Sequence, residues 1–357
     1  MHKRIRAALF SAALLLAGCT APATLAQGPF QPSDAPLSFA PLVRRVVPAV
    51  VNIQVIEGGG EANVAIPPEL RGTPAERMLR ERLRRRAVLG AGSGFIVDPS
   101  GIIVTNTHVV GHASRITVSL SEGRELPARV IGIDDLTDIA VIRVESSTPL
   151  PTVPWGDSRR VEVGDWILAA GNPFGVGISV TAGIVSARGR DIGAGPFDDF
   201  LQIDAPINPG NSGGPTFNMN GEVIAVNTAI VSPTGGSVGI GFAIPSEIAM
   251  RIVDDLRTKG RIERGWLGVS VQEAGPHGSG VAIAAVDRTG PAARAGLRPG
   301  DVVTAVNGQK VESTQSLIRA VAAITPGGSA RLTVRRGSGT VEVPVTVGRR
   351  PPEQPEE

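Results

Sequence analysis

The sequence predicts a mainly β fold of antiparallel barrels or sandwiches, followed by a smaller unit that combines strands and helices. Its 357 residues include Gly 45 and Pro 29, whereas aromatic residues make up 3% and tyrosine is absent. This composition is typical of short strands joined by tight turns. Segments rich in β-branched residues recur at regular spacing without helix-length segments between them, which argues against a parallel βαβ fold.

The expected strands share a high content of β-branched residues and end at Gly, Pro, Asn or Asp. In chain order they are 50–56, 94–97, 102–105, 116–120, 128–131, 139–144, 166–169, 177–185, 201–203 and 223–226.

Helical patterns are confined to two segments near the end of the chain. Residues 244–256 carry apolar side chains at helical spacing, and Ser246 is expected to cap the N-terminus of this helix. A polar linker at 258–264 then leads to a compact unit that begins at Gly265. This unit contains the second expected helix, at 313–324.

The charges of the chain are nearly balanced, with Lys+Arg 35 against Asp+Glu 33. Nucleic-acid binding would need a concentrated basic face with stacking aromatic residues, so we expect no nucleic-acid partner. The local exception is the arginine-rich segment 80–86, which is either a solvated helical or disordered loop or a site of contact with anionic lipid or of regulation. Residues 351–357 are expected to be a disordered acidic tail.

The N-terminus predicts export. Residues 1–26 begin with basic side chains and continue with an apolar stretch that is too short to span a membrane. Cys19, the single cysteine, ends a segment that resembles the bacterial lipobox, which predicts lipidation of that residue. The alternative is cleavage after Ala26, which would leave a soluble periplasmic protein. Residues 27–41 are expected to form a flexible tether.

Residues 207–215 read Ile-Asn-Pro-Gly-Asn-Ser-Gly-Gly-Pro and surround one serine with residues that favour tight turns. This serine, Ser212, is either a nucleophile or part of an ordinary loop. Gly210, Ser212 and Gly214 also match the G-x-S-x-G pattern of the α/β-hydrolases. Two scaffolds for a serine hydrolase therefore compete at this point.

The order of the partner residues decides between the scaffolds, because a serine nucleophile needs a base and an acid that orients it. His108 follows a β-branched segment, whereas His112 lies in a polar turn with no expected task. Asp138 precedes an apolar strand and is either a strand-end cap or the orienting acid. An α/β-hydrolase has the order Ser, acid, His, which leaves only His277, beyond the linker. The strand pattern and the order His108, Asp138, Ser212 exclude that scaffold.

The glycines of the loop also predict an oxyanion hole. Stabilising a tetrahedral oxyanion needs two N–H donors that converge on one point, and a glycine-rich turn can aim backbone amides without interference from side chains. The N–H groups of Gly210 and Ser212 are the expected donors.

Several longer stretches resemble the HtrA/Deg family of bacterial envelope serine proteases, which join a trypsin-like double β-barrel to PDZ domains. The resemblance covers about residues 40–350 and is carried by 92–97, 105–110, 137–141, 163–165, 171–175, 202–204, 207–215 and 238–245. It implies an all-β double six-stranded barrel of the chymotrypsin/trypsin type at 42–257 and a small α+β PDZ domain at 265–350.

The resemblance also implies residue roles. His108 would be the general base, Asp138 the orienting acid and Ser212 the nucleophile. The S1 pocket, which receives the residue before the cleaved bond, would be apolar and suited to Val or Ala. Its wall would be formed partly by Ile207, Asn227, Thr228, Ala229 and Ile230. Pro206 and Thr216 depart from the alanine and the aliphatic residue that the family usually has there, and the regulatory-loop segment 58–89 is arginine-rich.

Residues 290–308 resemble the core of a PDZ domain, and the loop before them resembles its carboxylate-binding loop. Bare N–H groups of such a loop receive a peptide C-terminus while the peptide adds a strand. The loop residues are Gly265, Trp266, Leu267, Gly268 and Val269. The alternative is a small barrel that merely packs on the protease.

Together these features predict an exported, lipid-anchored serine endoprotease of protein quality control, which needs no cofactor and no metal. Its partners would be unfolded proteins or peptides, and peptide C-termini at the PDZ domain. The resemblance implies a homotrimer or higher oligomer assembled through residues near 39–47. The alternatives are a chaperone or holdase-like binding protein, and a regulatory protease with one dedicated membrane-protein substrate.

Overall fold

The computed structural model describes residues 38–57, 73, 89–173, 177–274 and 280–350. The chain divides into two compact units, residues 1–39 and 40–357, and only the last two residues of the first unit are described. The export signal with Cys19, the arginine-rich segment 80–86, His277 and the tail 351–357 lie outside the described residues.

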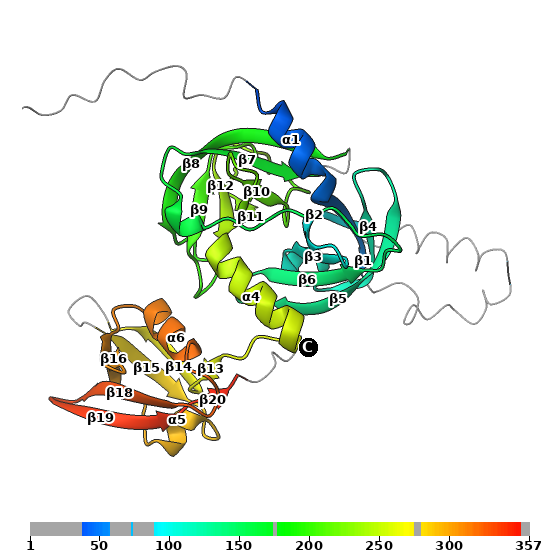
Figure 1. Ribbon diagram of the computed structural model, residues 1–357. Helices are drawn as coiled ribbons and strands as arrows, with labels where there is room; N and C mark the ends of the chain where they lie inside the picture. Colours follow the sequence, from blue (N-terminus) through cyan, green and yellow to red (C-terminus); the bar gives the residue numbers. More distant parts are fainter. Residues whose placement is uncertain (1–37, 58–72, 74–88, 174–176, 275–279, 351–357) are drawn as a thin grey trace, which may run out of the picture. The chain divides into compact units, whose positions relative to one another are not determined.

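Two closed antiparallel barrels of six strands each form the larger part of the second unit (Figure 1). The first barrel has the strand order β1-β2-β3-β6-β5-β4. Its strands are β1 (Val50–Glu57), β2 (Leu89–Asp98), β3 (Ile102–Thr105), β4 (Ala113–Ser119), β5 (Glu125–Asp134) and β6 (Ile139–Val144).

The second barrel repeats this topology with the order β10-β11-β12-β9-β8-β7. Its strands are β7 (Trp166–Gly171), β8 (Ser179–Arg190), β9 (Phe200–Ile203), β10 (Pro215–Phe217), β11 (Val223–Ile230) and β12 (Gly241–Pro245). The predicted double-barrel fold is confirmed. Each barrel encloses its own cluster of buried aliphatic side chains, so the two barrels have separate hydrophobic cores.

The ten predicted strands all coincide with observed strands, but β10 and β12 did not stand out in the strand pattern. β10 has three residues and starts within the proline- and glycine-rich turn, so it is too short to show an alternating pattern. Residues 244 and 245, expected in a helix, are instead the end of β12.

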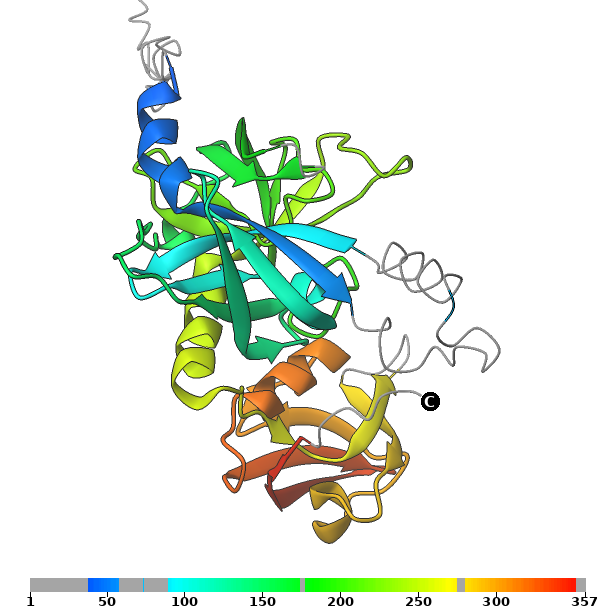
Figure 2. The same cartoon turned by 90° about the vertical axis from the view of Figure 1, so that its right-hand side faces the viewer.

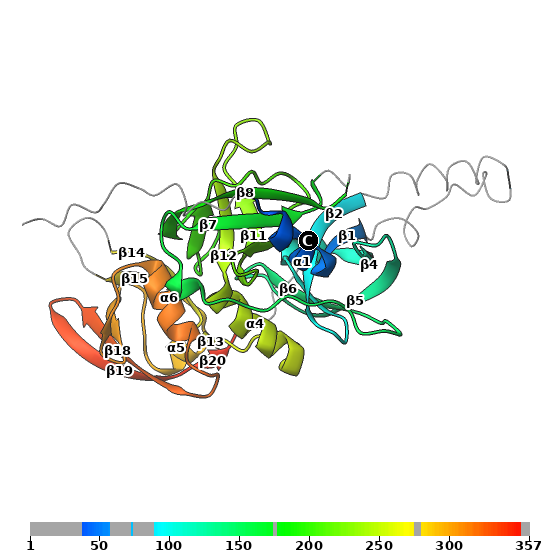
Figure 3. The ribbon, with the colours of Figure 1, turned by 45° about the horizontal axis from the view of Figure 1, so that its top comes forward.

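Helices and 3₁₀ turns flank or connect the barrel strands. They are α1 (Ala40–Val46), the 3₁₀ turn η2 (Val47–Ala49), α3 (Thr107–Val110), the 3₁₀ turn η4 (Ser158–Arg160) and α4 (Ser246–Lys259). α4 packs along β5, β6 and β11 (Figure 3). None of the helices in the described ranges combines the length and hydrophobicity that a membrane-spanning helix needs.

The prediction that Ser246 caps α4 is wrong. The N-cap is Pro245, and no side chain caps this helix end. The Ser246 hydroxyl instead donates to the Gly156 carbonyl at 2.7 Å and accepts from the N–H of Ser158 at 3.1 Å. A tertiary contact therefore uses the hydroxyl that local sequence rules assign to a cap. The helix ends at Gly260, whose φ of 71° is the left-handed conformation that suits glycine.

The C-terminal part of the second unit is a sheet of strands ordered β14-β15-β16-β18-β19, with β17 paired to β16 and a separate pair β13-β20. The strands are β13 (Gly265–Trp266), β14 (Val269–Glu273), β15 (Val281–Val286), β16 (Val302–Val306), β17 (Gln309–Lys310), β18 (Ser329–Arg336), β19 (Gly339–Thr346) and β20 (Gly348–Arg349). The helices are α5 (Pro291–Arg294) and α6 (Thr314–Ala322).

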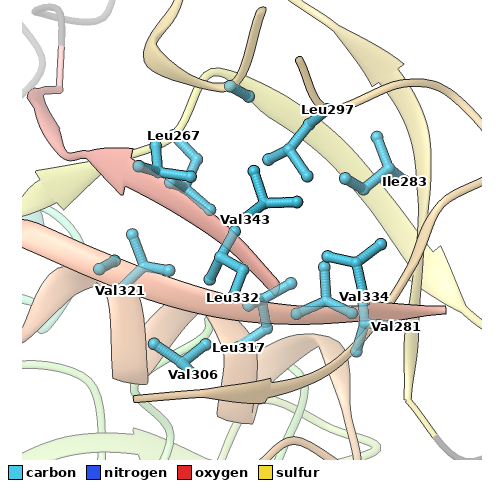
Figure 4. Packing of buried hydrophobic residues seen from close by; sticks show 14 of the residues in the cluster. Leu267, Val281, Ile283, Leu297, Val306, Leu317, Val321, Leu332, Val334 and Val343 are labelled. Atoms are coloured by element: carbon cyan, nitrogen blue, oxygen red, sulfur yellow. The ribbon is translucent and has the colours of Figure 1, made fainter. Parts of the chain in front are cut away.

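Helix α6 lies across this sheet (Figure 2), and Leu317 and Val321 on its inner face are buried. They meet sheet residues such as Leu332 and Val343 in one apolar cluster (Figure 4). Ser313 caps α6 in a reciprocal capping box. Sheet, helix and cluster together make a small α+β unit.

Candidate active site

The histidine and the aspartate of the predicted triad come from the first barrel and meet in the structure. His108 lies on the single turn of α3, directly after β3, and Asp138 immediately precedes β6. The His108 Nδ1 and Asp138 Oδ2 atoms are 2.7 Å apart. The other carboxylate oxygen of Asp138 accepts from the His108 backbone N–H at 3.0 Å. One carboxylate thus fixes both the ring and the backbone of the histidine.

The backbone of Asp138 is also held by hydrogen bonds. Its φ of 55° is a left-handed conformation, which aspartate tolerates better than most residues. Its carbonyl accepts from the side-chain amide of Asn106 at 2.8 Å and from the N–H of Thr107 at 3.2 Å. The side chains of His108 and Asp138 are 49% and 26% exposed, so the pair faces solvent in an open cleft. Of the two roles open to Asp138, strand-end cap and orienting acid, this geometry supports the orienting acid.

Ser212 comes from the second barrel, in the loop between β9 and β10. Its Oγ atom lies 3.4 Å from the Thr228 carbonyl oxygen. Among the described residues no hydrogen bond joins Ser212 to His108. Catalytic hydrogen bonds are often long in the absence of substrate and shorten when it binds.

Several backbone groups of the Ser212 loop are paired. The carbonyl of Asn208 accepts from Asn211 N–H, and the carbonyl of Asn211 accepts from Gly214 N–H, each at 3.0 Å. The N–H of Gly213 donates to Asn227 and the carbonyl of Ser212 accepts from Ser93, each at 2.8 Å.

The two predicted oxyanion donors of the loop have no partner in the described segments. Within the described ranges, no hydrogen bond uses the N–H of Gly210 or of Ser212. Gly210 has a φ of 101°, which only glycine adopts without strain. Both N–H groups predicted for the oxyanion hole are therefore without a partner among the described residues.

The residues predicted for the S1 wall fall into two groups. Thr228, Ala229 and Ile230 are half-buried at the end of β11. Ile207 and Asn227 are almost completely buried, with 2% and 0% exposure. The Asn227 amide bonds the Ala170 carbonyl and accepts from the Thr216 hydroxyl inside the barrel. The Asn227 side chain is therefore held inside the barrel, next to the half-buried residues 228–230, and the S1 wall remains a prediction.

A cavity of about 320 Å³ adjoins the histidine–aspartate pair. Thr228 and Ala229 form one side of it, and the apolar side chains of Phe197 and Phe200 form another. Neither phenylalanine stood out in the sequence pattern as a site residue. Among the described residues, no cluster of three or more His, Cys, Asp or Glu side chains is arranged to hold a metal ion.

The predicted carboxylate-binding loop of the α+β unit has its own pair of free donors. The carbonyls of Leu267 and Gly268 accept from Ala292 and Asp287, each at 2.8 Å. The N–H groups of Leu267 and Gly268 have no partner in the part of the chain that the structure describes. Gly268 has a φ of 75°. An apolar pocket beside the loop is lined by residues that include Trp266, Val269, Leu317 and Val321.

Two closed six-stranded barrels, the first carrying a hydrogen-bonded His108–Asp138 pair and the second a serine in a glycine-rich loop, define the class of trypsin-like serine peptidases. Comparisons with known proteins agree. The model of the trypsin-like peptidase domain matches residues 92–226, and that of the PDZ domain matches residues 265–347.

Curated relatives are similar over most of the chain. A probable periplasmic serine endoprotease DegP-like of Brucella suis biovar 1 (strain 1330) is 44% identical, over 88% of this chain and 69% of its own. A protein of the same description from Rhizobium meliloti (strain 1021) is 41% identical, over 88% of this chain and 70% of its own. Among solved structures, an HtrA-type protease AlgW with decapeptide shares 37% identity with a TM-score of 0.77, over 89% of this chain and all of its own. The chain belongs to the HtrA/Deg family of periplasmic serine endoproteases with a PDZ domain.

Proposed function

We propose that His108, Asp138 and Ser212 form the catalytic triad of this endoprotease. Asp138 accepts the Nδ1 proton of His108, which leaves Nε2 free to take the proton of the Ser212 hydroxyl. Ser212 Oγ then attacks the peptide carbonyl, and the N–H groups of Gly210 and Ser212 stabilise the oxyanion. His108 protonates the leaving amine, and water hydrolyses the acyl-enzyme by the same steps. The short contact between His108 Nδ1 and Asp138 Oδ2 is the observation that carries this proposal.

Casein digestion by the wild-type protein and by Ser212→Ala tests the triad. We expect the variant to lose nearly all turnover, because no other hydroxyl occupies its position. Ser146→Ala is the matched control, since the Ser146 hydroxyl is exposed and bonds only Thr148 in its own turn. Casein turnover by Ser212→Ala equal to that of the wild type would refute the assignment, whereas no turnover by either protein would favour a chaperone-like binding protein.

The domain limits and substrates are part of the same proposal. The protease domain spans residues 42–257 and the PDZ domain spans residues 265–350, with the linker between them. The substrates are unfolded or misfolded envelope proteins, and small aliphatic residues fit the S1 pocket. The free N–H groups of Leu267 and Gly268 support binding of a peptide C-terminal carboxylate to the PDZ domain. This mode of binding makes the chain a protease that senses or presents unfolded C-termini.

The N-terminal part of the chain is proposed to anchor and assemble the protein. Cys19 becomes the lipidated first residue of the mature chain, and a homotrimer or higher oligomer forms through residues near 39–47. Mass spectrometry of the mature N-terminus tests the anchor: a diacylglycerol-modified Cys19 is expected, and a free Gln27 would refute it. Native mass measurement of the purified protein gives the number of subunits, and a monomer would contradict assembly.

A further inference from the structure

Ser93 is a completely buried polar residue that connects the first barrel to the nucleophile loop of the second. It lies on β2 with 0% exposure. Its hydroxyl donates to the Gly210 carbonyl at 2.6 Å and accepts from the N–H of Asn172 at 2.8 Å. Its backbone N–H donates to the Ser212 carbonyl at 2.8 Å. One residue therefore contacts the loop on both sides of Asn211.

The carbonyl of Gly210 accepts a hydrogen bond from a side chain, whereas other carbonyls of the loop accept from backbone N–H groups. The carbonyls of Asn208, Asn211 and Ser212 each accept from a backbone N–H. In the described part of the chain, the only donor to the Gly210 carbonyl is the Ser93 hydroxyl. A peptide group next to a glycine rotates at low cost, since no Cβ restricts it. The peptide between Gly210 and Asn211 is therefore held at its carbonyl by the Ser93 side chain. Its N–H bonds the Asn208 carbonyl of the same loop, 3.0 Å away, so Ser93 connects the peptide to the rest of the fold.

This peptide lies between the two proposed oxyanion donors. The N–H of Gly210 precedes it and the N–H of Ser212 follows one residue later, so a rotation at Gly210 changes the angle between them. Packing also restricts the loop here: a Cβ on Gly213 would lie 2.3 Å from the Ser93 carbonyl oxygen. The backbone of Ser93 therefore occupies the space next to Gly213.

We infer that Ser93 is a positioning residue for the oxyanion hole. By holding the Gly210 carbonyl, its hydroxyl keeps the Gly210 and Ser212 N–H groups aimed at one point. The inference rests on the proposed roles of Gly210 and Ser212. Ser93 itself touches neither substrate nor the reacting atoms, so its removal weakens stabilisation of the transition state and leaves substrate binding in place.

The protein offers a closely matched control in Ser246. That residue is also 0% exposed, and its hydroxyl also donates to a backbone carbonyl and accepts from a backbone N–H, in this case those of Gly156 and Ser158. It lies at the start of α4 and bonds no residue of the nucleophile loop. Ser93→Ala and Ser246→Ala therefore each remove one donated and one accepted hydrogen bond from an equally buried site, and we expect similar decreases in Tm.

The experiment measures kcat and KM of the full-length protein on a peptide substrate, together with the Ki of a peptide boronate that mimics the tetrahedral intermediate. Loss of an oxyanion donor lowers kcat on the order of 10²–10³-fold, and a misaligned pair is expected to reach the lower end of this range. Ser93→Ala should therefore lower kcat about 10²-fold, raise the boronate Ki in parallel and leave KM unchanged. Ser246→Ala should keep all three constants near the wild-type values.

The inference is overturned when folded Ser93→Ala has the kcat of Ser246→Ala, or when its KM rises while the boronate Ki stays constant. If Ser93→Ala does not fold, Ser93→Cys replaces it, because a thiol is a weaker donor at the same place. A folded Ser93→Cys with wild-type kcat then contradicts the inference. Failure of the proposed function is recognised separately, since Ser212→Ala would in that case remain active.

Discussion

The nucleophile loop at 207–215 and the PDZ loop at 265–269 use the same backbone device for different purposes. Each turns through a glycine with positive φ, Gly210 or Gly268, and in each the two N–H groups expected to bind an oxygen have no partner among the described residues. The first loop approaches Asn106, which bonds Asp138. Its Gly210 and Ser212 carbonyls accept from Ser93 of the other barrel. The second loop has an apolar pocket and no base beside it. A pair of free N–H groups is thus only a binding device, and it becomes catalytic when a base and a nucleophile stand next to it.

The largest expected effect comes from disabling the base, which is the feature that distinguishes the nucleophile loop from the PDZ loop. Asp138→Asn removes the charge that orients His108, and kcat should fall about 10⁴-fold, as in other triads with this change. Binding of a C-terminal peptide to the PDZ domain should stay unchanged. Asp135→Asn is the control, because Asp135 lines the same cavity beside His108. An Asp138→Asn variant with kcat close to that of the control would contradict the triad.

The next largest effect concerns the ion pair that stabilises the PDZ domain. The nucleophile loop differs in this respect, because its hydrogen bonds join uncharged groups. The Asp301 carboxylate, 2% exposed, accepts two bonds from Arg336 at 2.7 Å each and one from the N–H of Arg298 at 2.9 Å. The Arg336 guanidinium, chiefly, and the N–H of Arg298 lower the pKa of Asp301, although burial opposes them. A lowered pKa in the folded state means that this stabilisation is complete above the ordinary aspartate pKa and is lost as the pH falls through the folded value.

Asp301→Asn should therefore destabilise the PDZ domain by about 1.5–3 kcal/mol at pH 7 and by progressively less in acid. Hydrogen exchange of the strand at 302–306, followed from pH 7 to pH 3, with correction for the intrinsic exchange rate, measures the difference. Glu312→Gln is the control, because its ion pair with Lys310 is exposed and contributes little. A difference between wild type and Asp301→Asn that does not narrow on acidification would contradict the assignment.

The smallest effect sharpens the role of the PDZ loop. In Gly268→Ala the new Cβ would lie 3.1 Å from both Gly290 and Trp266, at a φ of 75°. The free loop relieves this left-handed strain of about 1–2 kcal/mol by moving its N–H groups out of place, and binding must restore it, so affinity for a peptide with a free C-terminal carboxylate should fall roughly tenfold. Fluorescence anisotropy with a labelled peptide measures this, and the amidated peptide should bind weakly to both proteins.

Gly296→Ala separates loop geometry from general strain. Gly296 has a φ of 77°, but nothing lies within 4 Å of the place that a Cβ would take, so this variant carries the strain outside the loop. Equal losses of peptide affinity in the two variants would show that the loop has no special role.

Much of the site was predictable because its parts are local in sequence. The glycine-rich turn around Ser212, the strand before His108 and the position of Asp138 are each recognisable alone, and their order excludes the α/β-hydrolase scaffold. Ser246 shows the limit. Local rules predict a helix cap, but its hydroxyl bonds Gly156, about ninety positions away in the chain. Asn227 was expected in the S1 wall because of the family resemblance, and the bonds of its side chain inside the barrel were not visible in the sequence.

The sequence by itself determined the strand pattern, the turn residues and the kinds of catalytic side chain, because these follow from backbone preferences and from side-chain chemistry over a few residues. Only the tertiary structure decided which polar groups meet. The Ser93 hydroxyl acquires its importance from a carbonyl 117 positions away, on the other barrel. Such pairings depend on how two closed barrels pack, and no local pattern carries that information.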